Sequence, residues 1–239
     1  MPDSASDYRA MIEMPWGRMF YDLIFRQLKL PEKPCLRILD YGSGFGVAAS
    51  HYARWHTVTA VEPNVEMLAL RIAGQPYTQI EGGIECLPNV PEPFDLVLCH
   101  NVLEYADDPA HVVAELLRAL RPGGLLSVVK HNLPGRAMAA AVLEDNPVKA
   151  LQLISGEAEE SDALFGRRNL YSDDELRLWT GGLSVVKQHG LRTFYALSRY
   201  NEVKFDDAWY AGMLALELAA GERPEYQAVS FFRHVVFRK

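Results

Sequence analysis

The sequence predicts one α/β domain with a doubly wound, mostly parallel sheet. Short apolar or β-branched segments alternate with helical ones between residues 36 and 130, an order that places helices on both faces of a parallel sheet. A glycine-rich turn, Gly42-Ser43-Gly44-Phe45-Gly46, joins the first strand directly to a helix. The chain has 239 residues and is 49% hydrophobic, which suits a single domain of this kind with additions.

Two short helices are expected before the sheet, because large apolar residues recur at helical spacing from Ser6 to Leu30 and Pro15-Trp16-Gly17 interrupts them. Asn64 can cap the helix after the second strand, and Asp108-Pro109 opens another helix. Strands are expected at residues 36–40, 57–62, 77–81, 94–99 and 125–129, with helices over 47–55, 64–73 and from 108 to about 120.

The pattern is less regular after the fifth strand. Helices and loops are expected over residues 132–168, including an acidic stretch at Glu157–Asp162, and Ser172-Asp173-Asp174-Glu175 is a capping box. The last elements expected are a strand over Ser184–Ala196 with an interruption at His189-Gly190, a helix over 204–220 and a strand over Val229–Phe237. We divide the domain into an N-terminal helical lid (1–34), a cofactor-binding core (35–132) and substrate-side helices with C-terminal strands (133–239).

Composition excludes several classes of protein. The sequence has no apolar run of the roughly 18–20 residues that a membrane span needs, and its first residues are polar. Three cysteines without a CxxC spacing suggest neither a disulfide framework nor a metal site, so we expect a cytoplasmic protein without metal or membrane partners. The net charge of −7 disfavours broad binding to nucleic acid, although residues 164–204 carry seven basic and four acidic residues, a local excess of +3.

The glycine-rich turn and a later acidic residue form the pattern of a cofactor site. Glycines permit positive φ angles and a close approach of ligand to backbone, and the first N–H groups of the next helix are free to bind it. Glu62 lies ~20 residues beyond the turn, at the end of the second strand, where a carboxylate can accept hydrogen bonds from a ribose diol. The spacing is Gly-x-Gly-x-Gly, and Asp40 directly precedes it.

These segments resemble the class I S-adenosylmethionine-dependent methyltransferases. The resemblance rests on four motifs in order, which are residues 38–46, 61–68, 94–105 and 120–126. It implies a Rossmann-like sheet of seven strands with an antiparallel last strand, and S-adenosyl-L-methionine as cofactor. It also implies cofactor contacts for Arg18, Asp40, Gly42, Ser43, Gly44, Glu62, Ile84, Glu85 and His100.

The implied contacts differ in kind. Gly42, Ser43 and Gly44 would line the amino-acid portion of the cofactor, and Asp40 would lie near its ammonium group. Glu62 would bind the ribose. Ile84 and Glu85 would flank the adenine, His100 would lie near the sulfonium, and Arg18 would reach the cofactor from the N-terminal helices.

A closer resemblance is to the tRNA 5-carboxymethoxyuridine carboxyl-methyltransferase family. Similar segments include 100–105, 131–135, 190–195 and 232–235, so the likeness extends over most of the chain. The acceptor of that family is a carboxylate on a modified wobble uridine of tRNA. The region 144–168 departs from the family because it is acidic here and more basic there.

A carboxylate acceptor is already ionised at pH 7 and requires no general base. It requires a cation and hydrogen-bond donors that align it with the methyl group. Arg192 is the first candidate, with Asn132 and Tyr195 as hydrogen-bond partners. Candidates for RNA contacts are the cations Lys130, Arg136, Arg167, Arg168, Arg199 and Lys204 and the aromatic residues Tyr171, Tyr195 and Tyr200.

Two other functions fit the sequence. A small-molecule O- or N-methyltransferase would use the region after residue 132 as a lid over a closed pocket. A catalytically inactive cofactor-binding scaffold would not need the intact Asp40, Gly42, Gly44 and Glu62. An open, positively charged mouth would favour RNA, and a capped apolar pocket would favour a metabolite.

Overall fold

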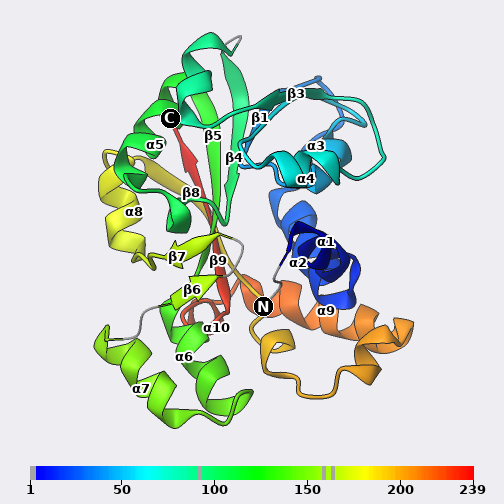
Figure 1. The fold of residues 1–239 in the computed structure, drawn as a ribbon, viewed down its shortest axis with the longest axis vertical. Coiled ribbons are helices and arrows are strands. Elements are labelled where there is room, and N and C mark those ends of the chain that lie inside the picture. Colours follow the sequence, from blue (N-terminus) through cyan, green and yellow to red (C-terminus); the bar gives the residue numbers. More distant parts are fainter. Residues whose placement is uncertain (1–3, 91–92, 158–159, 163–164) are drawn as a thin grey trace.

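A computed structural model describes residues 4–90, 93–157, 160–162 and 165–239. Its centre is a seven-stranded sheet in the order β3-β2-β1-β4-β5-β9-β8 (Figure 1). β9 is antiparallel to both β5 and β8, and the pairs from β3 to β5 are parallel, so the expected Rossmann-like sheet is confirmed. The strands are β1 (Arg37–Tyr41), β2 (Thr57–Glu62), β3 (Thr78–Glu81), β4 (Phe94–His100), β5 (Leu120–His131), β8 (Ser184–Leu191) and β9 (Phe232–Arg238).

The order of the strands reverses beside β1. The chain runs outward from β1 to β2 and β3, then returns to the other side of β1 as β4. Asp40 in β1 pairs with Ala60 of β2 and Leu98 of β4. In open α/β sheets a ligand crevice forms at such a switch point, outside the carboxyl ends of the strands. The glycine-rich turn after β1 therefore lies at this crevice.

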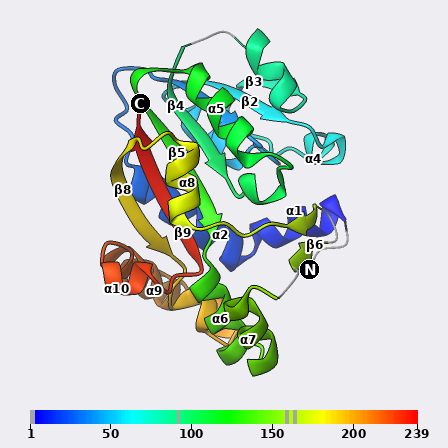
Figure 2. The same ribbon diagram turned by 90° about the vertical axis from the view of Figure 1, so that its left-hand side faces the viewer.

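Helices cover both faces of the sheet (Figures 1 and 2). Apolar residues of α2 and α3 pack with Ile38 and Leu98 of the sheet, and residues of α5 and α8 pack with Leu39 and Val97 on the other face. The helices are α1 (Ala5–Glu13), α2 (Pro15–Leu28), α3 (Val47–Tyr52), α4 (Val65–Ala69), α5 (Pro109–Ala119), α8 (Asp173–Trp179), α9 (Asp207–Gly221) and α10 (Pro224–Gln227), with 3-10 turns at Ile84–Asn89, Leu103–Tyr105, Tyr195–Leu197 and Glu202–Phe205.

A helical insertion follows β5 and lies at the lower end of the molecule in Figure 1. It consists of α6 (Leu133–Val142) and α7 (Pro147–Ser155). The short antiparallel strands β6 (Glu160–Asp162) and β7 (Gly166–Arg168) come next, and the sequence pattern did not predict them. The expected acidic stretch at 157–162 falls partly on residues 158–159, which lie outside the described residues.

Local sequence signals explain where several helices begin. Pro15 follows the extended residue Met14, so α1 ends and α2 starts at the expected break. Asp108 accepts a hydrogen bond from the N–H of His111 at 2.9 Å, and Ser172 and Glu175 complete the predicted capping box. Among the described residues, no helix has the length and apolar character needed to span a bilayer.

The predicted strand over Ser184–Ala196 was wrong at two points. β8 continues through His189-Gly190 without interruption, because both residues stay paired with β9. The strand ends at Leu191, because Arg192 has a φ of 57° and the chain then enters a 3-10 turn. Arg192 therefore stands in the left-handed region, which non-glycine residues rarely occupy.

Candidate active site

The turn after β1 depends on glycine at Gly42. This residue has a φ of 72°, and a Cβ atom built on it would lie 2.3 Å from Cγ2 of Val102. The N–H groups of Gly42 and Ser43 donate to the carbonyl of Val61, at 2.9 and 3.1 Å, which fixes the turn against β2. Both the backbone conformation and the close approach therefore require glycine.

Asp40 presents an unpartnered oxygen at this turn. Its side chain is buried, and Oδ2 has no hydrogen-bond partner among the described residues. Burial raises the pKa of Asp40 to about 7, and the neighbouring Glu62 adds to the rise. A cation placed next to this carboxyl group would favour its ionised form. Asp40 can therefore hold an ammonium group.

Glu62 joins the glycine-rich turn to the start of α4. Its Oε2 accepts from the N–H of Gly44 at 2.8 Å, and its Oε1 accepts from the N–H of Asn64 at 2.9 Å. Burial raises the pKa of Glu62, whereas these two hydrogen bonds lower it. Each carboxylate oxygen has a second lone pair, so Glu62 can still accept the hydroxyl groups of a ribose.

Ile84 and Glu85 stand in the 3-10 turn after β3. Ile84 packs against the core cluster on the α5 face. The Glu85 carboxylate turns back to accept the N–H of Gly83 at 2.7 Å, and backbone hydrogen bonds lower its pKa. In this conformation Glu85 stabilises its own turn, so a contact with adenine stays a proposal.

His100 belongs to a buried chain of polar groups that crosses the sheet. Its Nε2 lies 2.9 Å from Oγ of Ser127, which lies 2.9 Å from Nε2 of His234. Nδ1 of His234 is in turn 2.9 Å from Oε1 of Gln27 in α2. Burial lowers the pKa of His100 to about 3, so its imidazole is neutral at pH 7. A neutral ring can lie near a cationic sulfonium without repelling it.

The N-terminal helices cover the glycine-rich turn. Tyr8 of α1 lies 5.6 Å from the ring of Phe45, measured between ring centroids, and Nε of Arg9 donates to the carbonyl of Leu70 at 3.3 Å. Tyr21 of α2 lies near Asp40, whose charge adds to the effect of burial in raising the Tyr21 pKa. The sequence pattern does not single out Tyr8 or Tyr21, because each fits the helical pattern equally well as a packing residue.

Arg18 occupies a different position from the other predicted cofactor contacts. Its guanidinium lies 4.3 Å from the ring centroid of Tyr210 in α9, and its Nε lies 3.7 Å from Asp22. Its side chain is 60% exposed. These contacts join α2 to α9, so a role for Arg18 at the cofactor stays a proposal.

Arg192 and Tyr195, two of the predicted acceptor residues, lie together at the end of β8. The Arg192 guanidinium is 5.4 Å from the Tyr195 ring centroid and is also packed against the rings of Phe231 and Phe232. Nε of Arg192 and the hydroxyl of Tyr195 are buried and have no hydrogen-bond partner among the described residues. The two unpartnered groups could therefore bind an anionic acceptor.

Asn132 has a structural task in this region. Its Nδ2 donates to the carbonyl of Ser230 at 2.8 Å and to that of Ala228 at 3.0 Å. These hydrogen bonds hold the segment before β9 against the end of β5. Because these backbone carbonyls accept the amide hydrogens, the Asn132 side chain positions the backbone in this conformation and has no hydrogen left for an acceptor.

Burial removes several residues from the predicted surface for RNA. Lys130 is 2% exposed and donates to the carbonyl of Tyr171, and Lys204 is 7% exposed and donates to that of Ser198. Tyr171 and Tyr195 are buried as well, so these four residues are not part of an exposed surface that could contact RNA phosphates or stack with bases. Arg167 and Tyr200 remain exposed. The prediction is wrong for the buried residues, which include Arg168, because sequence alone does not distinguish buried from exposed side chains.

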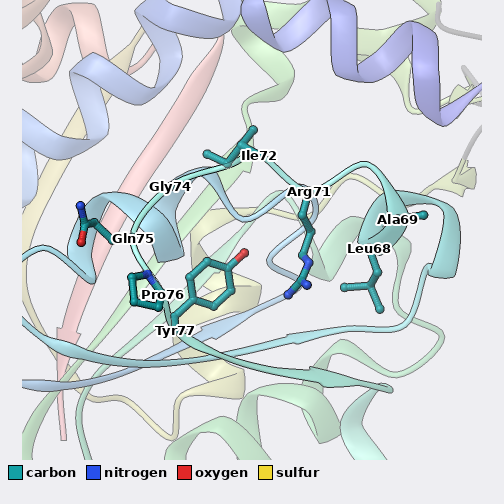
Figure 3. Close-up of a pocket in the computed structure, with 8 residues that line it drawn as sticks. All are labelled: Leu68, Ala69, Arg71, Ile72, Gly74, Gln75, Pro76 and Tyr77. Atoms are coloured by element: carbon teal, nitrogen blue, oxygen red, sulfur yellow. The ribbon is translucent and has the colours of Figure 1, made fainter.

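A cavity of about 340 Å³ is lined by residues between Leu68 and Tyr77, which run from the end of α4 toward β3 (Figure 3). Arg71 and Tyr77 lie side by side on its wall. The N–H of Ile72 donates to the carbonyl of Phe45 at 3.0 Å, and the Tyr77 hydroxyl lies against Gly46. This cavity flanks the turn and does not contain Asp40 or Glu62.

Comparison with known families identifies the core. A family model described as "Methyltransferase domain" matches residues 39–128, which include the glycine-rich turn, Glu62 and His100. The chain is a methyltransferase. The same residues contain every predicted cofactor contact except Arg18, so the part of the sheet that forms the crevice is the part that the family shares.

Curated relatives carry several methyltransferase names. The chain is 26% identical to the tRNA 5-carboxymethoxyuridine methyltransferase of Escherichia coli K12, over 87% of this chain and 81% of that protein. It is 34% identical to the malonyl-[acyl-carrier protein] O-methyltransferase of Enterobacter lignolyticus, over 60% of this chain and 59% of that protein.

Solved structures share the fold. One is the complex between the Trm112 methyltransferase activator of Haloferax volcanii and a methyltransferase, with a TM-score of 0.61, 16% identity and coverage of 100% of this chain and 98% of that one. Another is an S-adenosylmethionine-dependent methyltransferase from Mesorhizobium loti, with a TM-score of 0.56, 21% identity and coverage of 89% and 94%.

The residues at the turn fit S-adenosylmethionine, the cofactor of this class. Asp40 offers a buried, unpartnered carboxylate oxygen, and Ser43 offers a buried hydroxyl without a partner among the described residues. Glu62 retains lone pairs for a diol, and Gly42 leaves no room for a side chain beside the turn. The enzyme is thus S-adenosylmethionine-dependent.

Proposed function

We propose that the enzyme methylates a carboxylate, and that this carboxylate belongs to 5-carboxymethoxyuridine at the wobble position of tRNA. The observation that carries the proposal is the guanidinium of Arg192. It is packed between aromatic rings, and no hydrogen bond or ion pair connects it to another described residue. The buried Glu217 carboxylate favours the charged form of this guanidinium without forming an ion pair with it. A partly buried arginine without an ion pair is suited to bind an acidic ligand.

The backbone around Arg192 supports the same role. A φ of 57° places Arg192 in a conformation that a non-glycine residue adopts only when its surroundings enforce it. The buried carboxylate of Glu217 accepts from the N–H groups of Thr193, Phe194 and Tyr195, at 2.8, 2.8 and 2.7 Å. These bonds fix the turn that presents Arg192 and Tyr195, so the acceptor site is organised before the acceptor binds.

Methyl transfer to a carboxylate requires few catalytic groups from the protein. When bound, S-adenosylmethionine supplies a methyl group activated by its sulfonium. A carboxylate acceptor is ionised at pH 7, so no residue must remove a proton from it. Arg192 and the Tyr195 hydroxyl would hold one carboxylate oxygen while the other is aligned for transfer. The neutral His100 ring would add no further positive charge near the sulfonium.

Two features support RNA as the carrier of the carboxylate. The E. coli relative is named for 5-carboxymethoxyuridine in tRNA, and the similarity covers 81% of its length. Tyr200 and Phe205 are 74% and 62% exposed on the segment after Tyr195, where aromatic rings can stack with unpaired bases. Arg167 is exposed on β7.

A small carboxylic acid is the second candidate acceptor. It is favoured by the burial of Lys130, Tyr171, Tyr195 and Lys204, which leaves a closed surface where an RNA platform was expected. The name of another relative, malonyl-[acyl-carrier protein] O-methyltransferase, specifies O-methylation of an acceptor that is not RNA. Under this alternative Arg192 keeps its role, and only the carrier of the carboxylate changes.

The test is transfer of a labelled methyl group from S-adenosylmethionine to tRNA that carries 5-carboxymethoxyuridine, followed by mild alkali. Label that enters tRNA and is released by alkali identifies a methyl ester. We expect Arg192→Met to lower kcat/KM at least 100-fold while cofactor affinity changes less than twofold, and Arg192→Lys to recover part of the activity. Arg177→Met, at an exposed arginine of α8, is the matched control.

The outcomes separate the alternatives. No transfer to tRNA, in a protein shown to bind S-adenosylmethionine, rejects the RNA acceptor. Transfer to small carboxylic acids would then support the second candidate. Binding of S-adenosylmethionine without transfer to tRNA or to any small carboxylic acid would support the inactive scaffold and reject both enzyme proposals.

A further inference from the structure

A second cavity lies between the edge strand β8 and the C-terminal ends of α2 and α9. Its volume is about 650 Å³, within the range of pockets that bind small molecules. Methyl transfer as proposed above does not use it. The residues that line it are Arg26, Gln27, Lys29, Val186, Lys187, Gln188, His189, Leu218 and Glu222.

His189 provides a polar group on the wall of this cavity. Both of its ring nitrogens are buried and lack a hydrogen-bond partner among the described residues. Burial lowers the pKa of His189, so the ring is neutral at pH 7 and offers one donor and one acceptor. Most buried polar atoms of proteins are hydrogen-bonded, and each exception calls for an explanation. A ligand in the cavity would supply the missing partner.

The remaining charged residues of the cavity favour an anion. Arg26, Lys29 and Lys187 contribute three positive charges, whereas Glu222 contributes one negative charge. The ammonium of Lys187 is held in place by the carbonyls of Gln27 and Leu28, at 3.3 and 3.2 Å. In a chain with a net charge of −7, this surplus of cations around one cavity is a local feature.

The wall of the cavity is connected to the methyl-transfer site. The His189 ring lies 6.1 Å from the ring of His234, measured between centroids. Gln27 lines the cavity and is hydrogen-bonded to His234, which reaches His100 through Ser127. Binding of a ligand in the cavity can therefore be detected at His234 and His100, the histidines of this series of hydrogen bonds.

We propose that this cavity binds a small ligand through an oxyanion, either a carboxylate or a phosphate. Arg26, Lys29 and Lys187 bind the oxyanion, and His189 hydrogen-bonds to the body of the ligand. None of these residues belongs to the cofactor crevice, so anion binding here can be tested independently of the proposed acceptor.

The test is a titration of protein with ¹⁵N-labelled histidine rings by inorganic phosphate and, separately, by succinate, with ionic strength held constant by NaCl. The His189 signal is assigned with a His189→Asn variant. We expect it to shift and saturate with at least one of the two anions. A response to phosphate alone or succinate alone identifies the oxyanion, and a response to both supports the shared chemistry.

Matched variants make the test specific. Arg26→Gln should weaken binding at least threefold, and Glu222→Gln should strengthen it, because it removes the opposing charge. Arg54→Gln, at an exposed arginine elsewhere on the surface, should leave binding unchanged. Calorimetry provides the same comparison if His189→Asn does not fold. The proposal is overturned if neither anion binds, or if Arg26→Gln and Arg54→Gln behave alike.

Discussion

Oε1 of Glu217 in α9 accepts the N–H of Tyr195 at 2.7 Å, across 22 residues of sequence. The same carboxylate accepts the N–H groups of Thr193 and Phe194, and its side chain is fully buried. Successive backbone N–H groups that point to one place form an anion-binding concavity. Glu217 fills that concavity from within the protein, and this fixes the turn that follows Arg192.

We therefore expect Glu217→Gln to loosen the turn. The amide would keep one accepting oxygen but present an NH₂ group to a backbone donor, which should lower the free energy of unfolding by about 1–3 kcal/mol in urea denaturation. Cofactor affinity should change little, because the turn lies apart from the glycine-rich loop. Glu225→Gln, at an exposed glutamate, is the control. An equal loss of stability in both variants would contradict the assignment.

Gly42→Ala should abolish cofactor binding through a steric clash. The new Cβ would lie 2.3 Å from Cγ2 of Val102, and φ is 72°. Gly123→Ala has a similar φ of 77°, but its new Cβ would meet no atom of the described residues within 4 Å, so it isolates the cost of the backbone conformation to stability, about 1–2 kcal/mol.

Calorimetry with S-adenosylmethionine separates the two effects. The double variant Gly42→Ala with Val102→Ala should recover part of the binding, because the clash is relieved and the backbone cost remains. If the double variant binds the cofactor no better than Gly42→Ala alone, the contact with Val102 is irrelevant.

Asp40 should make cofactor binding depend on pH. Its pKa is about 7 in the free protein because the group is buried, and a bound ammonium would lower this value. Binding therefore favours the ionised carboxylate, and the dissociation constant should rise up to tenfold per pH unit as pH falls from 7 to 5.5. Asp40→Asn should bind more weakly at pH 8 and lose this dependence.

The same substitution should also affect stability without cofactor. The pKa of Asp40 is higher in the folded protein than in the unfolded chain. Its contribution to stability is therefore fully present below the pKa of the unfolded chain and is lost as pH rises through 7. Asp40→Asn should thus stabilise the cofactor-free protein at pH 8, as measured by urea denaturation. A destabilised variant would indicate that Oδ2 has a structural partner.

The sequence predicted the core well because its signals are local. The glycine-rich turn, Asn64, Asp108 and the capping box at Ser172 each act within a few residues, and each occurs where it was expected. The crevice follows from the strand order, so Asp40 and Glu62 could be placed near it from their positions at the strand ends.

Long-range pairing could not be predicted in the same way. Nothing in the local pattern around Ser127 indicates that it joins His100 to His234, 107 residues later. Similarly, Lys130 and Lys204 resemble ordinary surface cations in the sequence, and only the folded chain places backbone carbonyls around their ammonium groups. The errors in the predicted RNA surface arise from this difference.

The buried histidines should make the protein sensitive to acid. Burial keeps the folded pKa of His234 well below 6.5, so below pH 6.5 the unfolded chain binds a proton that the folded chain does not. Stability must therefore fall as pH decreases from 6.5. His234→Gln, which can keep hydrogen bonds to Ser127 and Gln27, should reduce the slope of unfolding free energy against pH by up to about 1.4 kcal/mol per pH unit between pH 4 and 6.

Urea denaturation at several pH values measures this slope. His111→Gln, at an exposed histidine of α5, controls for the loss of one histidine from the unfolded chain. Ser127→Ala should lower stability at every pH, because it leaves unpaired one nitrogen of the buried His234 ring and one of the partly buried His100 ring. If His234→Gln leaves the slope unchanged, His234 is not the neutral link between Ser127 and Gln27, and the polar chain does not extend from His100 to α2.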